Sequence, residues 1–233
     1  MIVSARMLSR LSVVAAILVP LAGLARAESG PAVYAALGLK ARDVLNGTVL
    51  TAQVLPGTSK QVVALVTCFT GKRDDAEAVN VRLAVFQKNG ENLESVYSRD
   101  FGKENGGYVG RGELTLVDLD GDGVSEIVVT YDNLKDRLIV ERRGEILSHE
   151  PPGFRVVWSG AMEYDATRAA RELPSERRDR FIRRIDIPAT LKTRGLTLLM
   201  TKRVIAVAGE RLAEPQEARE AFPLRPERDA PNP

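Results

Sequence analysis

The sequence predicts an all-β, mainly antiparallel fold, organised as a β-propeller-like array of about three four-stranded units. Short runs of apolar and β-branched residues, bounded by turn residues, recur along the chain and are typical of strands. Residues 47–67 align with residues 112–132 at a constant offset. The alignment pairs Gln61 with Glu126, so the first copy lacks the acidic residues of the second. A fixed repeat of this size is how arrays of blades appear in sequence.

A second pattern supports the repeat. The tetrad Gly-Glu-x-Leu begins at Gly90, Gly144 and Gly209, each time after a strand-like run, and predicts a tight hairpin turn at each glycine. The segments 96–98 and 157–159, Val-Tyr-Ser and Val-Trp-Ser, correspond in the strands after the first two turns. The predicted units cover approximately residues 47–110, 112–165 and 181–223.

Three units are few for a closed propeller, which usually has about four to eight blades. An open array would expose sheet faces and strand edges. Three solutions remain open from the sequence: other segments supply part of a further blade, the chain closes the array by forming a homo-oligomer, or the units pack as an open assembly of sheets.

The first 27 residues have the pattern of a secretory signal peptide. Two arginines precede an apolar run over residues 11–24, and Ala25-Arg26-Ala27 forms a small-residue cleavage site. Pro20 and Gly23 interrupt the run, which favours cleavage over a membrane anchor. We therefore expect an exported protein, periplasmic or secreted, with no stable membrane anchor after cleavage.

The predicted mature chain comprises a β domain over residues 28–223 and a mobile tail over residues 224–233. Removing residues 1–27 leaves 30 basic against 31 acidic side chains, because three of the 33 lysines and arginines are lost. A nearly neutral chain does not favour nucleic-acid binding.

Residues 118–126 are the one stretch that specifies definite chemistry. Aspartates stand at the first, third and fifth positions, and the glycine at the sixth permits a sharp turn, as in loops that fold around calcium. An EF-hand also needs a bidentate glutamate at the twelfth position, which is Val129. The flanking runs are typical of strands, so the loop joins two strands and Glu126, at the ninth position, becomes the fourth acidic candidate.

This stretch, from Val117 to Val129, resembles the calcium loop of FG-GAP and VCBS-type repeats, which build β-propeller blades. In that family the ligands are acidic side chains at positions one, three, five and nine and a main-chain carbonyl at position seven; the last acid is usually aspartate. Without a cation the stretch would instead be an acidic, solvated turn of mutually repelling carboxylates. The ligands implied by the resemblance are Asp118, Asp120, Asp122, the carbonyl of Val124, and Glu126.

Catalytic motifs are scarce. The chain has one histidine, His149, whose neighbouring prolines predict an exposed turn, and one cysteine, Cys68, which lies in an apolar run and is expected to be buried. We therefore predict a non-enzymatic, calcium-stabilised module that binds a protein or a glycan. The alternative is a secreted or periplasmic hydrolase, or an accessory subunit of one, whose active site no motif reveals.

Overall fold

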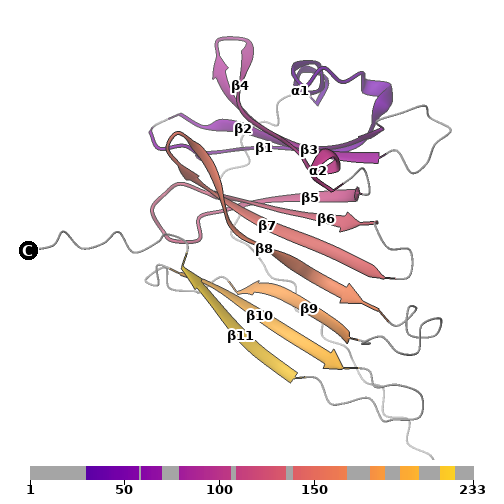
Figure 1. The fold of residues 1–233 in the computed structure, drawn as a ribbon. Helices are drawn as coiled ribbons and strands as arrows, with labels where there is room; N and C mark the ends of the chain where they lie inside the picture. The colour runs from indigo at the N-terminus through magenta and orange to yellow at the C-terminus, as the bar shows by residue number, and fades with distance from the viewer. Residues whose placement is uncertain are drawn as a thin grey trace, which may run out of the picture.

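The computed structural model describes residues 30–57, 59–69, 79–105, 109–134, 139–166, 179–186, 195–204 and 216–223. The predicted all-β, mainly antiparallel fold is confirmed in these segments (Figure 1). Their strands form one four-stranded sheet and one seven-stranded sheet, in which each pair of neighbours is antiparallel. Within the described segments the two sheets do not close into a ring of blades.

Each sheet is a meander in which strands follow one another in chain order. The first sheet contains β1 Val44–Ala52, β2 Gln61–Phe69, β3 Val79–Asn89 and β4 Asn92–Asp100. The second contains β5 Val109–Val117, β6 Glu126–Asn133, β7 Val140–Glu150, β8 Gly153–Asp165, β9 Asp179–Asp186, β10 Gly195–Val204 and β11 Gln216–Pro223. The helical elements are α1 Gly30–Ala36, the 3₁₀ turn η1 Ala41–Asp43, and α2 Phe101–Glu104.

Residues 181–223, which we expected to form a third unit, do not form a sheet of their own in the described segments. The strand β9 pairs with the edge of β8, where Glu163 stands opposite Ile182, and β10 and β11 continue from it. These strands therefore extend the second sheet edge to edge instead of stacking on its face.

The two central strands of the first sheet, β2 and β3, are buried on both faces. Strand β2 has apolar residues at consecutive positions, and alternation sends them to opposite sides of the sheet. Val63 and Leu65 face the second sheet, whereas Val62 and Val66 belong to a core on the far side. The helix α1 covers that far side and contributes the fully buried Val33.

The core between the sheets holds the two layers together. Each fully buried Val, Leu, Ile or Phe side chain there stabilises the fold by about 1.5–3 kcal/mol relative to an exposed one. Phe101 and Tyr131 meet with their ring centroids 4.9 Å apart. The buried members of this core are Val54, Val63, Leu65, Val81, Leu83, Val85, Phe101, Val109, Leu114, Ile127, Val129, Tyr131 and Leu147.

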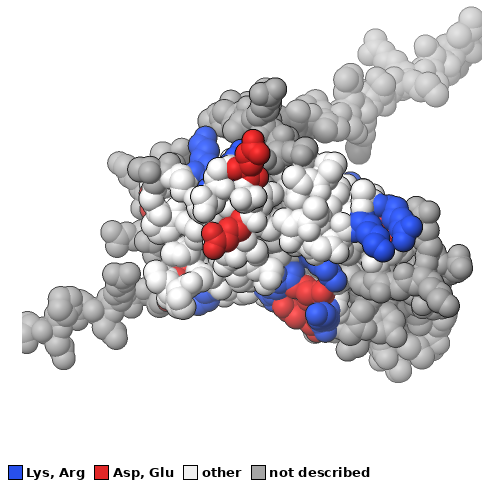
Figure 2. All heavy atoms as spheres, turned by 90° about the horizontal axis from the view of Figure 1, so that it is seen from above, with Lys and Arg blue, Asp and Glu red and all other residues white. Residues whose placement is uncertain are grey.

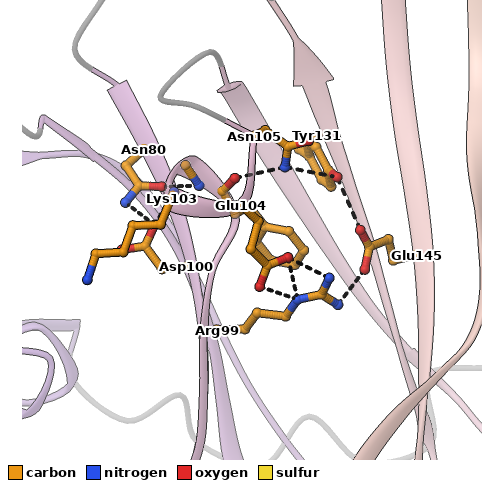
Figure 3. A network of polar contacts seen from close by, with 10 residues as sticks. Asn80, Arg99, Asp100, Lys103, Glu104, Asn105, Tyr131 and Glu145 are labelled. Atoms are coloured by element: carbon orange, nitrogen blue, oxygen red, sulfur yellow. Dashed lines mark hydrogen bonds and ion pairs between the residues drawn. The ribbon is translucent and has the colours of Figure 1, made fainter.

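A polar network joins the sheets at this core (Figure 3). The Arg99 guanidinium of β4 donates to Glu104 in α2 and, at 2.5 Å, to Oε2 of Glu145 in β7. The hydroxyl of Tyr131 in β6 donates to Oε1 of Glu145 at 3.1 Å. Burial, reinforced by the charge of Glu145, raises the pKa of Tyr131 to about 12. The phenol therefore stays protonated and remains a donor at neutral pH.

The first two strands of each sheet occupy corresponding positions in the sequence. Strand β1 begins at Val44 and β5 at Val109, while β2 begins at Gln61 and β6 at Glu126. Both pairs of starting points have the offset at which residues 47–67 align with residues 112–132. The starts of these strands therefore keep the offset of the sequence alignment.

The next two strands correspond at a slightly shorter offset. The starts of β3 and β7 are separated by the same length of chain as the starts of β4 and β8. The register of each hairpin shifts at the equivalent place, between Val85 and Phe86 in β3 and between Ile146 and Leu147 in β7. Each hairpin thus has a bulge-like irregularity at this offset, and the β7–β8 hairpin has a second one between Arg142 and Arg143.

Of the three predicted Gly-Glu-x-Leu turns, the first is confirmed. Gly90 lies in the turn between β3 and β4 with φ of 62°, a left-handed conformation that glycine adopts without steric cost. The third turn, at Gly209, lies outside the described residues.

The predicted turn at Gly144 is wrong. Gly144 lies inside β7 opposite Gly160, and the chain reverses at the cis Pro151-Pro152 pair. A Cβ at Gly144 would lie 2.6 Å from Cγ of Met162 and 3.2 Å from Cζ3 of Trp158. This glycine therefore makes room for side chains of β8, and the sequence alone does not distinguish that role from a turn.

Candidate metal centre

The loop between β5 and β6 contains the acidic stretch. Gly121 and Gly123 have φ of 76° and 86°, a region that residues with a Cβ rarely adopt. The Asp118 carboxylate accepts hydrogen bonds from the main-chain N–H groups of Gly121 at 2.7 Å, Asp122 at 3.2 Å and Gly123 at 2.9 Å. The first aspartate thus fastens the turn, and the two glycines allow it.

Three of the predicted ligands converge. Asp118, Asp120 and Glu126 each offer one carboxylate oxygen within a group whose atoms lie within 4.8 Å of one another. Calcium binds carboxylate oxygens at about 2.3–2.6 Å, so oxygens on opposite sides of one ion are separated by about 5 Å at most. The spacing of the three groups therefore fits a single ion of that kind.

The other two predicted ligands are on the same loop but outside this group of three. The Asp122 carboxylate accepts a hydrogen bond at 2.8 Å from the N–H of Val124. In this arrangement Asp122 orients the main chain at Val124, the residue whose carbonyl the family resemblance implies as a ligand.

Glu126 differs from the aspartates because it is almost fully buried, with 2% of its surface exposed. Its Oε2 accepts a hydrogen bond from the N–H of Leu119 at 2.8 Å, and its Oε1 accepts one from the Ser148 hydroxyl at 3.2 Å. Burial raises the pKa of Glu126 to about 7, with a smaller contribution from the charge of Asp120, although both hydrogen bonds oppose the rise.

This environment suits a cation. A buried carboxylate that faces other carboxylates is destabilised in its charged form, and a bound divalent cation would remove that penalty. The donor set contains oxygen atoms from carboxylates, which are the ligands that calcium prefers. The residues present therefore fit a divalent cation with oxygen ligands.

Two features of the site were missed by sequence reasoning. Ser148, in β7, reaches Glu126 from the neighbouring strand. Ser125 donates its N–H, at 2.7 Å, to the carbonyl of Gln53, which follows β1. No sequence motif indicates either contact. The alignment of Gln61 with Glu126 was the available signal that the loops before these two residues are related.

Cys68 and His149 were the two residues considered for catalysis, and the predicted burial of Cys68 is confirmed. Cys68 is buried, and burial raises the pKa of its thiol, which disfavours the reactive thiolate. His149 lies near the end of β7 and is half-buried against Phe154, so the expectation of an exposed turn at His149 is wrong. Burial lowers the pKa of His149, which keeps its ring neutral at neutral pH.

The surface carries mixed charge. On the face in Figure 2, acidic and basic side chains of described residues form small groups separated by uncharged residues. Among the helices in the described segments, none is long and apolar enough to cross a membrane.

Comparisons of the chain with protein-family models, with curated proteins and with solved structures found no match.

Proposed function

We propose that this chain is an exported calcium-binding β module of the FG-GAP or VCBS-like kind, in which calcium has a structural role. The observation that carries the proposal is the buried carboxylate of Glu126, which lies with those of Asp118 and Asp120 around one point of a glycine-permitted turn. Bound calcium would supply positive charge at that point. Asp118, Asp120 and Glu126 would hold the ion, and Asp118 also fastens the loop. Asp122 and the carbonyl of Val124 are the remaining ligands that the resemblance implies, and they lie on the same turn.

We also propose that the two hairpin pairs β1–β4 and β5–β8 are blade-like copies of one unit. The corresponding starting points of their strands and the equivalent bulges support this interpretation. The helix α1 would then close the outer face of the first unit, as capping elements do at the ends of repeat arrays.

The test of the calcium proposal is a thermal melt of the mature protein in chelator, in calcium and in magnesium. Calcium at about one hundred times its Kd should stabilise the fold by about 2.7 kcal/mol, which corresponds to a rise in Tm of several degrees in a domain of this size. Magnesium should substitute poorly because it prefers a smaller octahedral shell and retains its waters.

Two variants localise the effect. Asp120→Ala should abolish the rise in Tm with calcium, whereas Glu94→Ala, which removes an exposed carboxylate from β4, should keep it. An equal rise in Tm with calcium in the wild type and in Asp120→Ala would place the ion elsewhere. If calcium raises the Tm of none of the three proteins, the proposal is refuted.

The exported location and the partner need separate measurements. Intact mass of protein from the exported fraction should correspond to a chain that begins near Glu28; a mass that includes residues 1–27 would contradict export with cleavage. Because a structural ion holds the module together, capture of a protein or glycan partner from the same fraction should weaken in chelator.

A further inference from the structure

The loop between β1 and β2, residues 53–61, is the counterpart of the acidic loop. It joins the first two strands of its sheet as residues 118–126 join β5 and β6, and the two loops correspond in the alignment of the repeat. The last residue of the loop is Gln61 in the first sheet and Glu126 in the second. Both side chains are almost fully buried, with 1% and 2% of their surface exposed.

Each loop contains a hydrogen bond at the corresponding position. The N–H of Val54 donates to Oε1 of Gln61 at 3.0 Å, and the N–H of Leu119 donates to Oε2 of Glu126 at 2.8 Å. Val54 and Leu119 also correspond in the alignment of the loops, and both are buried. In each loop, therefore, the ninth side chain holds the second residue through one oxygen atom.

The loops differ in the second polar atom of the ninth side chain, which is an amide nitrogen in Gln61 and a carboxylate oxygen in Glu126. The Gln61 amide nitrogen donates to the carbonyl of Ser59 at 2.9 Å and to Oε1 of Gln87 at 3.1 Å. Ser59 has the place in the first loop that Val124 has in the second. A carboxylate has no donor, so Glu126 cannot draw in the carbonyl of Val124 without a positive partner between them.

The loops also touch each other. The N–H of Ser125, next to Glu126, donates to the carbonyl of Gln53 at 2.7 Å, and this bond connects the second sheet to the first. The side chain of Gln53 in turn donates to the carbonyl of Gly57 within its own loop. The conformation of each loop therefore affects the contact between the two sheets.

We propose that the two loops form one junction between the sheets, in which the Gln61 amide locks the first half permanently and a cation locks the second half conditionally. Calcium then acts as a conformational switch that tightens the contact between Ser125 and Gln53. This inference rests on the proposed function, because it requires that the acidic loop binds calcium.

The main test is Glu126→Gln, which gives the second loop the amide that the first loop already has. We expect its Tm in chelator to exceed that of the wild type, and we expect calcium to raise that Tm no further. The reverse change, Gln61→Glu, should lower the Tm in chelator and in calcium alike, because the first loop has no acidic residue at the positions of Asp118, Asp120 and Asp122.

Amide hydrogen exchange measures the junction directly. If exchange of the Ser125 N–H requires an opening that releases the ion, calcium at about one hundred times its Kd should slow that exchange about one hundredfold in the wild type. In Glu126→Gln the exchange should be slow in chelator and unchanged by calcium. The exchange of the Val54 N–H, held by Gln61, should be slow in all conditions.

The outcomes separate the two ideas. If calorimetry detects no calcium binding by the wild type, the proposed function fails and this inference fails with it. If the wild type binds calcium but the Ser125 N–H exchanges at the same rate with and without it, calcium binding stands and the switch is refuted. If Glu126→Gln has a lower Tm in chelator than the wild type, the amide does not replace the cation and the proposed equivalence of the two halves is wrong.

Discussion

The ion pair between Arg99 and Glu145 joins the two sheets, and removing Arg99 should destabilise the fold more than removing the charge of Glu145. Arg99 binds two carboxylates, those of Glu104 and Glu145, and 18% of its side chain is exposed, whereas 6% of the Glu145 side chain is exposed. Arg99→Met keeps much of the aliphatic stem but leaves Glu145 as a buried charge that retains the Tyr131 hydroxyl and loses the guanidinium. Leaving one charge of a buried pair uncompensated costs about 3–5 kcal/mol, and because Arg99 is partly exposed we expect a loss of about 3 kcal/mol.

Glu145→Gln should cost less. The amide keeps an acceptor for Tyr131 and places no charge in the core, while Arg99 retains Glu104, to which its Nε donates at 2.8 Å. Hydrogen bonds to charged groups contribute about 1.5–3 kcal/mol. We expect a loss of about 1.5–2 kcal/mol, at the low end of that range, because Arg99 keeps Glu104 and is partly exposed.

Urea unfolding followed by circular dichroism, at a fixed calcium concentration, measures both changes from the midpoint and slope. The double variant should lose less stability than the sum of the single losses, because the two residues are in contact. If both single variants lose the same free energy of unfolding, or if Glu145→Gln loses more, the uncompensated charge of Glu145 is not the dominant cost and the reasoning is refuted.

Two further changes test the acidic loop and the interior of the second sheet. In chelator, burial raises the pKa of Glu126 from its ordinary value of 4.5 to about 7, so the folded state binds the proton more tightly than the unfolded state. The stability of the wild type relative to Glu126→Gln should therefore fall by about 3 kcal/mol as the pH rises from about 4.5 to 7. A stability difference in urea unfolding that does not depend on pH would contradict this. Gly144→Ala should destabilise the fold by about 1–3 kcal/mol because its Cβ would lie 2.6 Å from Cγ of Met162, whereas Gly153→Ala, with no atom within 4 Å of the added Cβ, should be close to neutral. Equal thermal melts of the two alanine variants would show that the space beside Gly144 is not restrictive.

The sequence determined the features that depend on neighbouring residues. Alternation and β-branched runs specified strands on both sides of the acidic loop, and the loop itself followed from aspartates and glycines at fixed spacing, because local turn geometry depends on adjacent residues. The correspondence of Gln61 with Glu126 also followed from the sequence alignment, and in the structure both residues begin a strand after a loop of the same length.

Tertiary structure alone decided what each residue faces. The sequence does not show that Ser148 reaches Glu126, or that Glu126 is buried while Asp122 is turned to the main chain of Val124, because these contacts depend on strand register and on which face of the sheet a residue takes. The same reason explains the error at Gly144: a glycine that supplies φ above zero in a turn and a glycine that leaves space for Trp158 are identical in sequence, and only the packing across the sheet separates them.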